Sequence, residues 1–247
     1  MMNKKWIVIV SFAVVIGVGI LFFVNREPTP FLTMEEVTEI LNRQDINSPV
    51  QVLDIIDLEK SYRFVPFITE SGQRGISYWA FNHFEWKLVA YEWSDQLKVW
   101  KLSPDDPSSY YFVWHFETQK EVSQMNIHLL QNRSYHISGD TSFYMPSIQL
   151  HQNVDLTNKK YGVMSLPDEW QKIITAGSSI EEKSLFPSMS PSQSVFYFGR
   201  QILDEQGLDT QLNSNEHSGS MSTHWINESD FQLDYVVSIY EEQLARH

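Results

Sequence analysis

A run of apolar positions near the start of the chain is the strongest pattern in the sequence. Trp6–Val24 carries no charged residue, and Ser11 is its only hydroxyl side chain. At about 1.5 Å per residue, a helix of this length spans roughly 30 Å, the thickness of the hydrocarbon core of a bilayer. Backbone groups in lipid must be hydrogen-bonded within their own segment. The pattern therefore predicts a transmembrane helix that anchors the chain in a lipid bilayer.

The residues around this segment predict its orientation. Lys4 and Lys5 precede it, so the positive-inside rule places residues 1–5 in the cytoplasm and the bulk of the chain outside. A cleaved signal peptide has a shorter apolar region, about 7–15 residues, and a small-residue cleavage site, which Asn25–Pro30 does not offer. We expect an uncleaved, single-pass protein of the cell membrane, with a cleaved signal as the alternative. Residues 25–32 form a short proline-containing linker.

Helical and then extended patterns follow the linker. Thr33 and Glu36 have the spacing of a capping box, and the apolar stripe behind them predicts a helix that ends before Ser48-Pro49. From Val50 to about Leu156, β-branched and aromatic residues recur between short turn signals, which predicts an antiparallel meander. The expected strands are Val50–Leu58, Tyr62–Thr69, Gly75–Asn82, Phe84–Trp93, Leu97–Leu102, Tyr110–Glu117, Ser123–Leu130 and Ile148–Leu156.

The C-terminal part mixes both patterns. A helix is expected from Leu166, with Gly177 just beyond its end, and a strand over Val195–Leu203. Leu208–Thr223 is polar and rich in serine and asparagine, which is typical of a loop. Residues 229–247 fit both a strand alternation and a helical face, and their length slightly favours a helix.

Together these elements predict an α+β protein. An N-terminal transmembrane helix, residues 6–24, is followed by an extracytoplasmic domain over residues 33–247, in which a few helices flank an antiparallel meander sheet. A boundary between two subdomains, if the domain is divided, is expected near residues 157–166.

The net charge and the absence of cysteine limit which partners and which cellular compartment are expected. All 31 acidic residues follow the apolar segment, as do all of the 18 basic residues except Lys4 and Lys5, which leaves a formal charge of −15 beyond the membrane. Such a surface repels phosphate backbones, so no nucleic-acid partner is expected. The chain has no cysteine, which excludes disulfides, thiolate metal sites and cysteine nucleophiles. These features favour a protein of the bacterial cell envelope.

Motifs of catalysis and metal binding are missing from the sequence. It contains no GxSxG, SxxK, HExxH, GxGxxG, P-loop or EF-hand pattern. The eight histidines are scattered without the close spacing of metal ligands on one element. We therefore expect no cofactor and no metal, although a site assembled from distant residues leaves no such pattern.

Aromatic residues are the remaining unusual feature, at 14% of the chain. Large rings fill a core efficiently, and we expect most of them to be buried. The alternative is an exposed platform for a glycan or peptide, because the segment Tyr110–Phe116 carries rings on both faces of its predicted strand. The candidate binding surface comprises Trp93, Trp100, Tyr110, Tyr111, Trp114 and His115.

These observations favour a non-catalytic function. We expect a membrane-anchored protein that binds a protein, a peptide or a wall glycan at the cell envelope. The alternative is a cell-surface hydrolase whose active site has no recognisable motif.

Overall fold

The structure is a computed structural model that describes most of the chain beyond the linker. The described residues are 28–44, 46, 48–82, 84–93, 97–116, 122–138, 141–158, 160–182, 196–210, 223–240 and 244. The expected cytoplasmic residues 1–5 and transmembrane helix 6–24 lie outside them. Within the described ranges, no helix has both the length and the apolar character needed to cross a membrane.

The described part is mostly β, with antiparallel sheets and two α-helices. The first sheet contains β1 (Val50–Val52), β2 (Ile56–Glu59), β3 (Tyr62–Thr69), β4 (Arg74–Asn82), β5 (Glu85–Trp93) and β14 (His224–Trp225). The second contains β6 (Lys98–Lys101), β7 (Tyr110–His115), β12 (Tyr161–Ser165) and β15 (Gln232–Tyr235). The third contains β8 (Val122–Gln131), β11 (Ile148–Asp155), β13 (Phe196–Asp204) and β16 (Val237–Ser238). The remaining elements are α2 (Met34–Asn42), a 3₁₀ turn (Pro107–Ser109), α3 (Asp168–Glu182), and the paired strands β9 (Ser134–Ser138) and β10 (Thr141–Met145).

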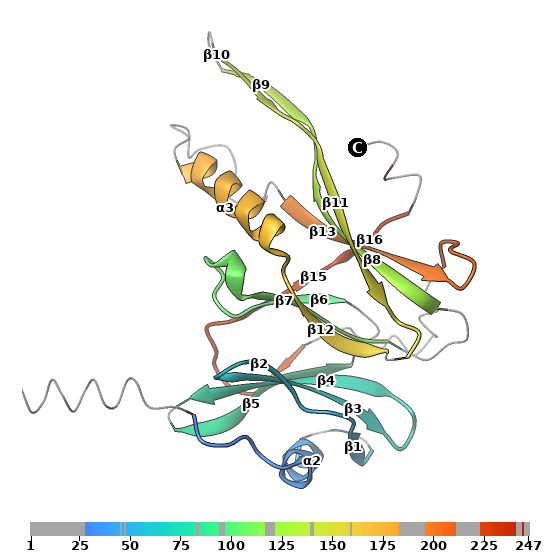
Figure 1. Ribbon diagram of the computed structural model, residues 1–247. Helices are drawn as coiled ribbons and strands as arrows, with labels where there is room; N and C mark the ends of the chain where they lie inside the picture. Colours follow the sequence, from blue (N-terminus) through green and yellow to red (C-terminus); the bar gives the residue numbers. More distant parts are fainter. Residues whose placement is uncertain are drawn as a thin grey trace, which may run out of the picture.

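The sheets are stacked as layers. Figure 1 shows α2 at the bottom, then the first, second and third sheets, with the β9–β10 hairpin projecting at the top. The strand orders are β1-β3-β4-β5-β14 with β2 beside β3, then β12-β7-β6-β15, then β11-β8-β13-β16. All pairs are antiparallel except β13 with β16. The meander prediction therefore holds for β3, β4 and β5, whereas the later strands form two further sheets.

The first helix begins as its sequence predicts. The backbone N–H of Glu36 donates to Thr33 Oγ1 at 3.2 Å, and the backbone N–H of Thr33 donates to Glu36 Oε2 at 2.8 Å. This capping box satisfies two backbone donors that would otherwise lack partners. Val37 and Leu41 are fully buried against the first sheet, so α2 covers its outer face.

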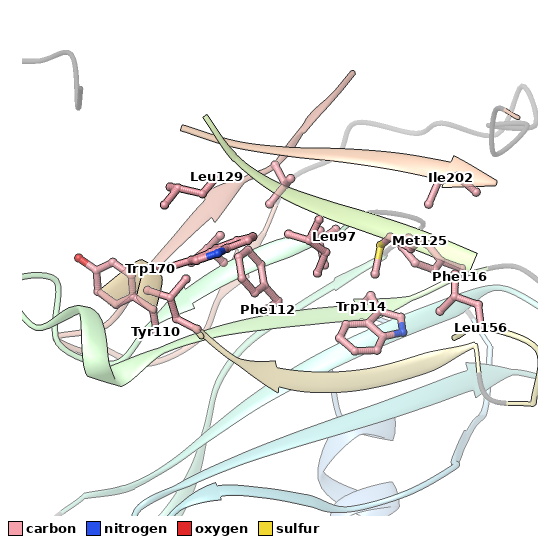
Figure 2. Close-up of a cluster of buried hydrophobic side chains, with 14 of the residues drawn as sticks. Leu97, Tyr110, Phe112, Trp114, Phe116, Met125, Leu129, Leu156, Trp170 and Ile202 are labelled. Atoms are coloured by element: carbon pink, nitrogen blue, oxygen red, sulfur yellow. The ribbon is translucent and has the colours of Figure 1, made fainter. Parts of the chain in front are cut away.

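Each interface between layers has its own hydrophobic core. The core between α2 and the first sheet includes Val37, Leu41, Val65, Phe67, Trp79, Trp86 and Leu88. The core between the first and second sheets includes Phe64, Ile76, Tyr78, Val89, Trp100, Val113 and Phe231. The core between the second and third sheets, which also takes in α3, includes Val99, Tyr110, Phe112, Trp114, Met125, Ile127, Leu129 and Trp170 (Figure 2). The first and second sheets are therefore buried on both faces.

The C-terminal segment differs most from expectation. The slight preference for a helix over residues 229–247 is wrong for the described residues 232–238, which form β15 and β16. Phe231 and Val236 are buried in cores on either side of the second sheet, and this burial outweighs the helical pattern. The helix expected to end before Gly177 also continues, as α3, to Glu182. Strands β9, β10 and β12 were not expected.

Candidate functional site

The six aromatic and histidine residues singled out from the sequence do not form an exposed platform. Trp100, Tyr110, Trp114 and His115 are buried, and Trp93 and Tyr111 are half-buried. The expectation of a solvent-facing surface built from these residues is corrected accordingly. The physical reason is that the second sheet is a middle layer, so rings on both faces of β7 fill two cores.

His115 illustrates this arrangement. Its Nδ1 lies 3.0 Å from the carbonyl oxygen of Gly75 on β4, so the ring connects the second sheet to the first. Burial lowers the pKa of His115 to about 4, against the opposing effect of the hydrogen bond to Gly75, and the nearby Arg74 lowers the pKa further. The ring is therefore neutral at physiological pH, and its contact with Gly75 helps to hold the two sheets together.

A polar cluster lies between the first and second sheets. The Lys98 Nζ lies 2.9 Å from Glu92 Oε2, and the hydroxyl of Tyr78 donates to Glu92 Oε1 at 2.6 Å. The hydroxyl of Thr223 also donates to Glu92 Oε2, at 3.0 Å, and the Lys98 Nζ lies 3.5 Å from the ring centre of Tyr235. Burial, followed by the charge of Glu92, raises the pKa of Tyr78 well above its ordinary value. Each of these polar groups has a partner, so the cluster joins the sheets and holds Thr223 in place.

Thr223 begins a segment, residues 223–230, that lies along the outer edge of β5 and that we call the edge segment. Trp225 pairs with Ala90 in the β5–β14 ladder. The backbone N–H of Ile226 donates to the carbonyl oxygen of Val89 at 2.8 Å. The side-chain amide of Asn227 donates to the carbonyl oxygen of Leu88 at 2.6 Å. Main-chain and side-chain bonds together fix the edge segment on the first sheet.

A cleft of about 950 Å³ opens beside the edge segment. Its lining comes from β3, β4, β5 and the segment from Trp225 to Phe231. The lining residues are Tyr62, Ala80, Phe81, Asn82, Lys87, Val89, Trp225, Ile226, Asn227, Glu228, Ser229, Asp230 and Phe231. Trp225 is 51% exposed, and its ring centre lies 5.4 Å from that of Phe231. The cleft thus presents an aromatic ring, amides and carboxylates to solvent.

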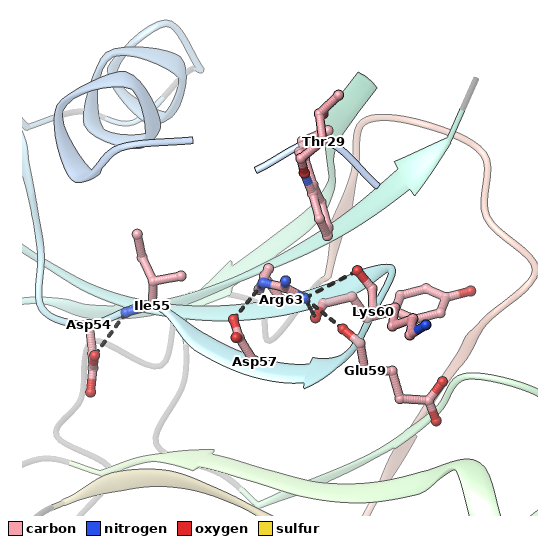
Figure 3. Close-up of polar contacts among 9 residues, drawn as sticks. Thr29, Asp54, Ile55, Asp57, Glu59, Lys60 and Arg63 are labelled. Atoms are coloured by element: carbon pink, nitrogen blue, oxygen red, sulfur yellow. Dashed lines mark hydrogen bonds and ion pairs between the residues drawn. The ribbon is translucent and has the colours of Figure 1, made fainter. Parts of the chain in front are cut away.

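The position of Tyr62 at the cleft depends on the β2–β3 hairpin. Arg63 holds this hairpin through bonds from its guanidinium to the carbonyl oxygens of Glu59 and Tyr62, at 2.6 and 2.8 Å, and through an ion pair of 2.5 Å with Asp57 (Figure 3). The same guanidinium lies 4.7 Å from the ring centre of Trp86. These contacts fix the hairpin against the core of the first sheet.

The Tyr62 hydroxyl remains protonated. Burial, followed by the charges of Asp230 and Glu59, raises the pKa of Tyr62 above its ordinary value. Its ring lies edge-on to Trp100 and Phe231, with ring centres 5.9 and 6.4 Å apart. Tyr62 therefore adds a protonated phenol, held by its ring contacts, to the residues that line the cleft.

The described lining of the cleft does not contain the pair of nucleophile and histidine that a serine hydrolase uses. It has no histidine, and the Ser229 hydroxyl oxygen accepts the backbone N–H of Phe231 at 3.3 Å. The two acidic side chains of the lining, Glu228 and Asp230, are both exposed. Among the residues that the structure describes, no three His, Asp or Glu side chains are grouped to hold a metal ion.

A second unusual group lies in the third sheet. His128 is buried, neither of its ring nitrogens has a hydrogen-bond partner, and burial lowers its pKa to about 4. His151 is opposite it on β11, with ring centres 5.8 Å apart. Two imidazoles alone do not define a metal site, and we assign the pair no chemistry.

Comparison with known proteins gives no relative. No protein-family model, curated protein or solved structure matches this chain.

Sequence reasoning did not identify the cleft. Its walls come from residues 62–89 and 225–231, which are far apart along the chain. The one local signal is the pair Trp225-Ile226, two large apolar residues directly after a polar, serine- and asparagine-rich stretch. In the fold Trp225 is 51% exposed and Ile226 is 42% exposed. A pair of apolar residues isolated in a polar loop is a weak sequence signal for such an exposed apolar surface.

Proposed function

We propose that this chain is a membrane-anchored, extracytoplasmic protein of the bacterial envelope that binds a ligand without transforming it. In this proposal residues 6–24 form the single transmembrane helix with its N-terminus in the cytoplasm, and residues 33–247 form an α+β ectodomain. The ligand is an envelope protein, peptide or glycan, and it occupies the cleft beside the edge segment.

The observation that carries the proposal is the exposed ring of Trp225 at the wall of a preformed cleft. Contiguous exposed apolar side chains with polar groups around them are typical of binding sites, and here Trp225 and Ile226 are adjacent in the cleft lining. The ladder contact with Ala90 and the packing against Phe231 hold this ring in place. A hydrolase of the serine type has less support, because the described lining supplies no histidine to activate Ser229.

Co-sedimentation with purified bacterial envelopes tests this function. The full chain in detergent should sediment with envelope fragments, and Trp225→Ala should remove most of this binding. Tyr144→Ala is the matched control, since Tyr144 is 62% exposed and lies on the β9–β10 hairpin. Equal sedimentation of Trp225→Ala and the parent chain would show that the cleft is not the binding site.

A further inference from the structure

We infer that the ligand of the cleft is an uncharged oligosaccharide, an inference that rests on the binding function proposed above. A sugar ring has C–H groups on its faces and hydroxyl groups around its rim. The C–H face packs on the negative face of an aromatic ring, and the hydroxyls bond to amides, carboxylates and tyrosine. The cleft brings these two kinds of group together.

The aromatic component is Trp225. Its ring is about half exposed, and Phe231 packs beside it. The backbone is fixed by the pairing of Trp225 with Ala90 and by the bond from Ile226 N–H to Val89. A ring that is already ordered loses little conformational entropy when a ligand stacks on it.

The polar component surrounds this ring. The amide nitrogen of Asn227 is bonded to Leu88, which fixes the orientation of the side chain and leaves its Oδ1 as an acceptor. Asn82, Glu228 and Asp230 add an amide and two carboxylates, and Tyr62 adds a protonated hydroxyl. These groups supply both the donors and the acceptors that sugar hydroxyls need.

The charges in the cleft favour an uncharged ligand. In the described lining, Lys87, Glu228 and Asp230 are the charged residues, which gives a formal charge of −1. Lys87 is itself paired with Glu85, at 2.8 Å. Among these described residues, a phosphate-bearing polymer would meet two carboxylates and one lysine that is already paired, in a chain that is acidic overall. The anionic polymers of the envelope are therefore poor candidates.

The sheet edge disfavours an extended peptide. Peptides commonly bind by adding a strand to a free sheet edge, where main-chain bonds supply the affinity. At this edge β14 and the Asn227 amide already occupy β5 from Leu88 to Tyr91. Beyond them, β5 leaves only Glu85–Lys87 at one end and Glu92–Trp93 at the other, so a saccharide fits the exposed chemistry better.

Calorimetric titration of the full chain tests the ligand class. The detergent should have a polyoxyethylene head group, because a maltoside would itself present sugars. The probes are chitotetraose, cellotetraose and a neutral glycine–serine peptide. We expect at least one tetrasaccharide to bind, Trp225→Ala to weaken it at least tenfold, and Trp225→Phe to recover part of the loss. Tyr144→Ala should bind like the parent, and unchanged circular dichroism confirms that each variant is folded. Asn82→Ala, which should also weaken binding, serves as the second variant if Trp225→Ala does not fold.

The other outcomes separate this inference from the function on which it rests. Saccharide binding that survives both cleft substitutions would place the sugar site elsewhere and overturn the inference. Binding of the peptide alone, lost in Trp225→Ala, would overturn the saccharide class and leave the cleft as a binding site. Binding of none of the probes, together with envelope sedimentation that does not depend on Trp225, would overturn both.

Discussion

Glu92 on β5 and Lys98 on β6 form an ion pair between two sheets, at 2.9 Å, and both side chains are only 4% exposed. A buried charge is costly unless it is paired and hydrogen-bonded. Here the carboxylate also accepts the hydroxyls of Tyr78 and Thr223. The pair therefore connects the first sheet, the second sheet and the start of the edge segment.

Breaking this pair should be strongly destabilising. Lys98→Met leaves the Glu92 carboxylate buried without its cation, and we expect a loss of about 3–5 kcal/mol in the free energy of unfolding. Adding Glu92→Gln removes the uncompensated charge and keeps an acceptor for Tyr78, so the double variant should recover most of the loss. Urea unfolding of the single and double variants measures this. Additive losses would contradict a paired buried charge.

The buried tryptophans provide a second test. Trp86 and Trp114 lie in different cores, at 8% and 6% exposure, and replacing either with alanine should cost about 3–5 kcal/mol. Trp225→Ala is the comparison, and because much of its ring is already in water we expect a loss below about 1 kcal/mol. Denaturant titrations measure these losses. A midpoint for Trp114→Ala equal to that of the parent chain would contradict the assignment of Trp114 to the core.

The sequence predicted the bounds of the central strands better than it predicted which elements pack against them. Alternation defined β3, β4, β5 and β7 to within about a residue or two, because period-two patterns are local. The rings on both faces of β7 were compatible with a strand buried on both faces, and also with a binding surface in which one face is exposed to solvent. Only the stacking of a third sheet over the second buries Trp114, and that contact lies far away in the sequence.

The low pKa of His115 predicts a pH-dependent stability. In the folded chain burial holds this pKa at about 4, compared with 6.5 as its ordinary value. Below pH 6.5 the unfolded chain therefore binds a proton that the folded chain does not, and stability falls as the pH falls towards 4. The contribution of His115 is fully present above pH 6.5 and amounts to roughly 3 kcal/mol.

Urea unfolding at pH 7 and pH 5 measures this effect. His115→Gln should lose less stability than the parent between these values, because its side chain does not titrate. His128, whose pKa is also about 4, should leave a residual dependence of the same sign. An identical decrease in the parent and in His115→Gln would show that His115 is not buried in its neutral form.

The C-terminal strands and the cleft could not be predicted from local sequence patterns, because both depend on contacts between residues far apart in the chain. Residues 232–238 pair with β6 and then with β13, so their conformation is set by two sheets and not by their own pattern. Trp225 likewise becomes a cleft wall only because Ala90 and Val89 receive the edge segment. The capping box of α2, in contrast, is a contact within four residues and was predicted correctly.

The central claim is that the cleft faces the outside of the cell and holds a ligand there. Since the chain has no cysteine, Ile226→Cys places a single thiol in the cleft, and Tyr144→Cys places one on the β9–β10 hairpin as a reference. The deciding measurement is the rate at which a membrane-impermeant maleimide labels each variant in intact cells and after purification. We predict that both are labelled in intact cells, and that labelling at position 226 relative to position 144 is several-fold slower there than in the purified chain. Labelling only after the membrane is broken, or an equal ratio in both settings, would contradict the claim.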